Sequence, residues 1–131
     1  MATQIQDLGL ANTTAAQVAY ASVPKYIQWG VGTGVTVSGT DLNSKTGTTE
    51  VRTAGTATDE TTTTTNDTFQ VVGTITALAA LSITEVGLFD SAGSASPPSG
   101  GNMAFYASFG VQTVAIGDSI TFTCKIVWDQ A

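Results

Sequence analysis

Apolar and polar residues alternate most regularly near the end of the chain, between Ser119 and Trp128. Every second residue there is apolar, and most of the residues between them are serine, threonine or lysine. A period of two residues is typical of a β-strand that buries one of its faces. The pattern therefore predicts a strand whose buried face carries five residues, Ile120, Phe122, Cys124, Ile126 and Trp128.

Shorter runs of strand-forming residues occur elsewhere, with turn residues at their ends. They predict strands at 25–31, 67–76, 82–89 and 102–111. Gly117 and Asp118 give a turn signal between the last of these segments and the C-terminal strand. This turn predicts that the two strands form an antiparallel pair.

The threonine-rich middle of the chain is open to two interpretations. Residues 50–57 and 59–65 have high β-propensity, which favours two exposed strands. The run of five threonines at 61–65 is also compatible with an extended linker. Of the two, we expect strands.

Many short strands separated by turns, without sustained helical periodicity, predict an all-β fold. The glycines between 30 and 39 and the proline- and glycine-rich segment 91–101 predict loops. We expect an antiparallel β-sandwich or a jelly-roll-like barrel with an extended N-terminal arm. Residues 1–23 would form this arm or a short helix. Residues 24–131 would form a single β domain, which is long enough to bury one core.

Neutral polar residues, threonine above all, take the place of charges in this chain. Charged residues make up 11% of its 131 residues, against about 25% in a typical soluble protein. The net charge of −6 includes four scattered basic residues, so we expect no nucleic-acid partner. No apolar run approaches the roughly 20 residues that span a bilayer, so we expect no membrane partner. The first residues lack a signal-peptide pattern and there is one cysteine, which together favour assembly in the cytoplasm.

The residues that most enzymes use are scarce. The chain has no histidine, which excludes the usual Ser-His-Asp and Cys-His arrangements and most zinc sites. Residues 41–45 begin like a calcium loop, but the glycine and the glutamate of that loop are missing at the later positions. The glycines at 30, 32 and 34 do not have the spacing of a dinucleotide-binding loop. We therefore predict no catalytic, cofactor-binding or metal-binding residues and no enzyme activity.

Four residues are candidates for contacts with a partner protein. Tyr26 and Tyr106 are the aromatic residues most free to lie at the surface. Asp59 and Glu60 are the only adjacent acidic pair, and their polar, threonine-rich segment favours a solvated face over a general acid–base pair. Cys124 shares a face with large apolar residues, which favours a buried and unreactive thiol.

The second half of the chain contains a succession of motifs: NDTFQVVGT at 66–74, ITEVGLFD at 83–90, GNMAF at 101–105 and GDSITF at 117–122. With YIQWG at 26–30, this succession resembles modules of small virion structural proteins of tailed bacteriophages. Such modules are found in capsid-decoration proteins and in tail-fibre or tail-tip proteins. The resemblance covers roughly residues 66–128.

The resemblance implies a capsid cement, or decoration, protein that lies on the capsid surface of the virion. Such a protein binds the major capsid protein between capsomers, and the resemblance further implies self-association as a homotrimer. The polar N-terminal arm would lie across a neighbouring subunit and become ordered on binding. The alternative is a tail-fibre or baseplate component that recognises a host surface. A polysaccharide hydrolase is disfavoured because it would need two carboxylates converging in a groove.

Overall fold

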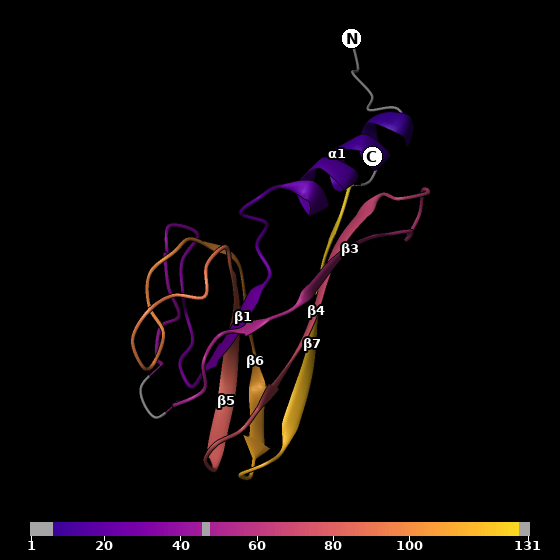
Figure 1. Cartoon of the computed structure of the whole chain (residues 1–131). Helices are drawn as coiled ribbons and strands as arrows, with labels where there is room; N and C mark the ends of the chain where they lie inside the picture. The colour runs from indigo at the N-terminus through magenta and orange to yellow at the C-terminus, as the bar shows by residue number, and fades with distance from the viewer. Residues whose placement is uncertain (1–6, 46–47, 129–131) are drawn as a thin grey trace.

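Two antiparallel β-sheets pack face to face in the computed structural model, which describes residues 7–45 and 48–128 (Figure 1). Sheet A has the strand order β2-β1-β5-β6, and sheet B has the order β3-β4-β7. Sheet A consists of β1 (Tyr26–Gly30), β2 (Thr53–Ala54), β5 (Leu81–Phe89) and β6 (Met103–Val114). Sheet B consists of β3 (Thr56–Glu60), β4 (Thr68–Thr76) and β7 (Ser119–Val127). The all-β prediction is confirmed, and of its two forms the sandwich is the one observed.

The core lies between the sheets because the strands present apolar residues at every second position. Ile27 and Trp29 of β1 lie opposite Leu88 and Val86 of β5, and all four side chains are buried. Sheet B contributes the buried residues Phe69, Val71 and Ile75 of β4. The Trp29 ring meets the Phe122 ring of β7 edge-on at a centroid distance of 6.4 Å.

The last two strands do not form the predicted antiparallel pair. β6 pairs with β5, whereas β7 pairs with β4 over nine residues. The turn between them crosses from one sheet to the other, and it is held where the amide of Ala77 donates to the carbonyl of Asp118 at 2.7 Å. The prediction is wrong because a turn signal fixes where the chain reverses, whereas the partner of a strand depends on matching strands elsewhere in the chain.

The run of threonines after β3 forms a turn and not the predicted strand. β3 ends at Glu60. The Asp67 carboxylate then accepts hydrogen bonds from the amides of three threonines that lie between Glu60 and Asp67. Its two oxygens lie 2.9 Å from the Thr62 nitrogen, 2.9 Å from the Thr63 nitrogen and 2.6 Å from the Thr64 nitrogen. An aspartate that binds nearby amides favours a turn over the strand preferred by the threonines themselves.

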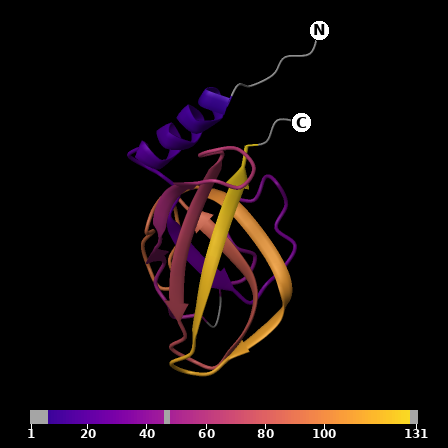
Figure 2. The ribbon, with the colours of Figure 1, turned by 90° about the vertical axis from the view of Figure 1, so that its right-hand side faces the viewer.

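A helix, α1 (Asp7–Ala19), occupies most of the segment for which an arm or a short helix was expected. Residues 1–6 lie outside the described part. α1 sits at one end of the sandwich, where it contacts β3 and β4 (Figure 2). Its buried Thr14 and partly buried Val18 are small, so they give a weak apolar period. Packing, more than helix propensity, stabilises such a helix.

The Asp67 turn makes the stability of the fold depend on pH. The amide of Thr64 contributes most to lowering the pKa of Asp67, burial opposes it, and the bonds from Thr62, Thr68 and Thr63 lower it further. A carboxylate whose pKa is lower in the folded state contributes stability above its unfolded pKa of about 3.9, and this is lost as the pH falls.

We expect the free energy of unfolding to fall as the pH is lowered from about 5 towards 2, and Asp67→Asn to weaken this dependence. Denaturant unfolding at a series of pH values measures it. Asp90, whose pKa is also lowered, leaves a residual slope in the variant. Asp59→Asn, at an exposed position of β3, is the control and should keep the wild-type slope. A wild-type slope in Asp67→Asn would contradict the prediction.

Candidate functional site

Two loops cover the outer face of sheet A, which is the face turned away from the core. They comprise residues 31–45 and 90–102 and lie together at the left of Figure 1. We call them the loop platform. Beneath them lie three buried residues of sheet A, Gln28, Glu85 and Phe89. β1 and most of β5 are therefore buried on both faces, whereas much of β6 is exposed, and only the inner face of the sheet belongs to the main core.

Glu85 holds the first loop of the platform. One carboxylate oxygen accepts hydrogen bonds from the amides of Gly32 at 3.3 Å and Ser44 at 2.9 Å, and the other accepts from the amide of Asn43 at 3.2 Å. The side chain is fully buried. Gly30 lies against the same carboxylate, and a Cβ atom at this glycine would approach the carboxylate oxygen to 2.5 Å. The close approach of the loop therefore requires glycine at position 30.

Arg52 joins the second loop to the same face. Its Nε atom donates to the Gln28 side-chain oxygen at 2.8 Å, and its Nη1 atom donates to the carbonyls of Ser91 at 3.0 Å and Gly100 at 2.7 Å. The guanidinium carbon lies 3.6 Å from the centre of the Phe89 ring, the geometry of a cation–π contact. Both ends of the second loop are thus fixed by one buried side chain.

Asp41 supplies a negative charge beside this arginine. Its carboxylate lies 3.8 Å from Nη2 of Arg52 and is also paired with Lys45. Burial lowers the pKa of Arg52, and the Asp41 and Asp90 carboxylates oppose that shift. Lys45 also donates to the carbonyl of Pro98 at 3.0 Å, which ties the two loops to each other. These groups form one network, so its charges are compensated within the platform.

Sequence reasoning did not single out Arg52 or Glu85. Arg52 was placed in a predicted exposed strand at 50–57, but it lies just before β2 and is buried. Glu85 appeared only as a letter of a motif. A signal was present for Glu85, which is the only charged residue between Asp67 and Asp90. An isolated charge of this kind indicates burial but does not identify its partners. Arg52, with Glu50 two residues before it, has no such signal.

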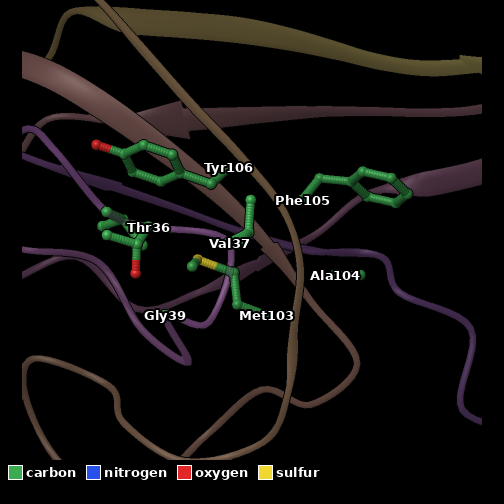
Figure 3. Close-up of a pocket in the computed structure, with 8 residues that line it drawn as sticks. Thr36, Val37, Gly39, Met103, Ala104, Phe105 and Tyr106 are labelled. Atoms are coloured by element: carbon green, nitrogen blue, oxygen red, sulfur yellow. The ribbon is translucent and has the colours of Figure 1, made fainter.

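A hollow of about 320 Å³ lies between the platform and β6 (Figure 3). It is lined by Val35, Thr36, Val37, Gly39, Met103, Ala104, Phe105 and Tyr106. Tyr106, Val37 and Met103 lie close together, whereas the Phe105 ring points the other way. The Tyr106 hydroxyl is buried without a hydrogen-bond partner in the described part of the chain. No charged side chain lines the hollow.

The structure separates the four predicted contact residues. Tyr26 begins β1 and Tyr106 lies on β6, so both tyrosines belong to sheet A and both are half-buried. The amine of Lys25 lies 5.8 Å from the centre of the Tyr26 ring. Asp59 and Glu60 end β3 of sheet B, where Asp59 is exposed and Glu60 accepts a bond from the Thr58 hydroxyl at 2.8 Å. Their role in partner contacts stays a prediction.

The outer face of sheet B, unlike that of sheet A, is open. Its exposed residues are mostly threonines, and cross-strand neighbours bind each other through their hydroxyls. Thr74 and Thr121 approach to 2.7 Å, as do Thr76 and Ser119. Lys125 and Glu60 are the charged residues of this face, so it is nearly neutral.

Reactive groups are few in residues 7–45 and 48–128. These residues contain no group of three or more histidine, cysteine or acidic side chains that could hold a metal ion. Cys124 is half-buried on the inner face of β7, and burial raises the pKa of its thiol, which lowers the fraction of reactive thiolate. The described helix is too short and too polar to cross a membrane.

No protein-family model, curated protein or solved structure matches this chain.

The Glu85 contacts predict a specific effect of its removal. Glu85→Ala leaves three loop amides without their acceptor, and an unsatisfied buried donor costs about 1–3 kcal/mol. We expect a loss of about 3 kcal/mol or more in the free energy of unfolding, measured with urea. Hydrogen exchange should speed up at the amides of Gly32, Asn43 and Ser44.

Glu60→Ala is the matched control, because Glu60 accepts hydrogen bonds from side chains in the described part of the chain. It should leave exchange at the three loop amides unchanged. Equal exchange rates in the two variants would show that Glu85 does not hold the loop.

Proposed function

We propose that this chain is a structural subunit of a tailed-bacteriophage virion, and specifically a capsid cement protein. It binds between capsomers of the major capsid protein and stabilises the capsid from its outer surface after assembly in the host cytoplasm. The motif succession at 66–122 supports the phage assignment by resemblance. The proposal includes self-association of the subunit.

One observation carries the structural part of the proposal: the acidic side chains are engaged in building the fold. Six of them accept hydrogen bonds from backbone amides, namely Asp41, Glu50, Asp67, Glu85, Asp90 and Asp118. A general acid or base needs a carboxyl group that can exchange its proton with a substrate. Carboxylates that bind amides instead stabilise turns and loops, which supports a structural role over a catalytic one.

Two aspartates of these motifs have structural roles in this fold. Asp90, which ends ITEVGLFD, accepts bonds from the amide and the side-chain nitrogen of Asn102, each at 2.8 Å. Asp118 of GDSITF accepts the amide of Ala115 at 2.8 Å in the turn before β7. These motif residues therefore hold a loop and a turn in place, as expected of a particle subunit.

The surfaces of the molecule fit repeated docking better than capture of a small ligand. The loop platform is held to sheet A by Glu85 and Arg52, so it presents a surface with little freedom to lose on binding. The outer face of sheet B is exposed and nearly neutral. Many modest contacts of this kind add up when a subunit binds a lattice at several points.

Particles that carry the protein provide the test. We expect its copy number, measured by quantitative mass spectrometry of purified virions, to follow the symmetry of the capsid lattice. Particles that lack it should lose heat and low-salt stability and recover it when the purified protein is added. A copy number that follows the tail, with stable capsids and lost adsorption, would refute the cement role and favour the tail-fibre or baseplate alternative.

A further inference from the structure

A free edge strand can pair with another chain, and proteins usually block such edges. Sheet A ends in β2 and β6, and sheet B ends in β3 and β7. β2 is two residues long, which is too short to offer a useful edge. β3 has five residues, carries Asp59 and Glu60, and contacts α1. The β2 edge is therefore too short to pair with another chain, and the β3 edge is protected by its acidic residues and by α1.

β6 is long but irregular. Its pairing with β5 shifts register twice, between Ile83 and Glu85 and again between Leu88 and Phe89. Bulges of this kind bend a strand and disturb the hydrogen-bonding edge. Residues 35–39 of the loop platform also lie beside residues 103–106 of this strand. The β6 edge is thus a poor template for another strand.

β7 differs from the other three edge strands. It forms nine consecutive pairs with β4 without a register shift, and its nine residues include no proline or glycine and a single charge, Lys125. Figure 2 shows β7 in yellow running the full height of the sandwich, with β6 in orange beyond it. Beside β7 lies a groove of about 270 Å³ towards β6, lined by apolar residues that include Phe105, Phe122 and Cys124.

We propose that β7 pairs with β7 of a second copy of this chain, antiparallel and about a two-fold axis perpendicular to sheet B. Pairing of this kind joins the three strands of sheet B in each copy into one continuous sheet. Residues directly opposite in an antiparallel pair lie on the same face of the sheet. A strand with strict alternation is therefore complementary to its own copy.

The register centred on Thr123 illustrates this complementarity. On the inner face, Phe122 meets Cys124 of the second copy, and Ile120 meets Ile126 of the second copy. On the outer face, Thr121 meets Lys125 of the second copy. The half-buried apolar residues beside the groove gain apolar neighbours, and no charged residue is placed opposite another.

The charge distribution favours a second copy at this edge. Each chain carries a net charge of −6, so two copies repel each other over most of their surfaces. The segment 103–127 contains one acid and one base, Asp118 and Lys125, and is neutral overall. In the Thr123-centred register the two Lys125 residues are four positions apart along the strands, about 13 Å. That separation exceeds the Debye length of about 8 Å at physiological salt.

The size of the edge sets the strength of the contact. Nine residues at about 3.4 Å each give a contact about 30 Å long, and two sheets about 10 Å apart make it about 20 Å wide. Each copy would bury about 600 Å², or about 1,200 Å² in total, which is the lower end of stable interfaces. We therefore expect a dimer that dissociates on dilution.

This inference concerns the purified chain alone and does not rest on the proposed virion function. A two-fold contact uses the same surface on both copies and closes at two. It therefore predicts a dimer, whereas the resemblance described above implied a homotrimer. The mass of the assembly in solution separates the two.

A pair of matched variants tests the proposal. Thr123 on β7 and Thr56 on β3 lie in the same cross-strand row on the outer face of sheet B, on either side of Val72, and both are exposed. Thr123→Lys adds a charge to the β7 edge in each copy, whereas Thr56→Lys adds the same charge to the opposite edge. Circular dichroism and thermal melting establish that both variants are folded.

Sedimentation equilibrium over a wide concentration range is the readout. We expect the wild type and Thr56→Lys to show a monomer–dimer equilibrium, and Thr123→Lys to stay monomeric. A wild type that is monomeric throughout, even one that accepts a strand of a different protein, would overturn the proposal. A trimer would overturn it too, as would equal dimerisation of the two variants.

A crosslinking measurement keeps the proposal testable if the lysine variant fails to fold. In a Cys124→Ser background, Thr123→Cys should yield covalent dimers with a short bismaleimide, and Thr56→Cys should not. The yield should fall on dilution together with the dimer fraction. Equal yields from the two cysteine variants would contradict pairing through β7.

Discussion

The burial of Glu85 and Arg52 on the outer face of sheet A is the constraint on which the loop architecture depends. A carboxylate or a guanidinium removed from water costs several kcal/mol unless it is paired and hydrogen-bonded. Here the partners are backbone amides at 32, 43 and 44 and backbone carbonyls at 91 and 100. Lifting the first loop would leave Glu85 without these amides, and lifting the second would remove both backbone carbonyls from Arg52. The two loops are therefore part of the folded sheet, although they contain little regular secondary structure.

The strands with alternating apolar and polar residues were predictable, because the alternation that marks the buried face lies within each strand's own sequence. β1, β4, β5 and β7 lie within or close to the segments expected, with the apolar face of β4 inward as the alternation requires. α1 was harder to predict because Thr14 and Val18 give a weak apolar period. The turn at 61–65 depends on Asp67, whose carboxylate overrides the strand preference of the threonines. The partner of β7 depends on β4, more than 40 residues away, and no local signal contains it.

The candidate surfaces were less predictable than the fold, for the same reason. Arg52 reaches carbonyls that lie 39 and 48 residues further along the chain. The neighbours of Arg52 in the sequence are rich in threonine and alanine, and they predict an exposed strand. The tyrosines chosen from the sequence do lie on the surface side of sheet A, but Tyr106 is covered by the platform to the point that its hydroxyl is buried. Exposure depends on which loop folds over a strand, and composition does not encode that.

The two sheets differ in how their outer faces are covered, and this difference affects which kinds of contact each face can make. Loops held by Glu85 and Arg52 cover the outer face of sheet A, although Nη2 of Arg52 has no hydrogen-bond partner in the described part of the chain. Sheet B keeps an outer face of paired hydroxyls, as between Thr74 and Thr121, and ends in the unblocked β7. A surface held in place by a few charge–charge contacts would be sensitive to salt, because exposed ion pairs contribute at most about 1 kcal/mol and are screened. Contacts made through backbone pairing and threonine methyl groups are not screened, so association through this neutral edge and face would depend little on ionic strength.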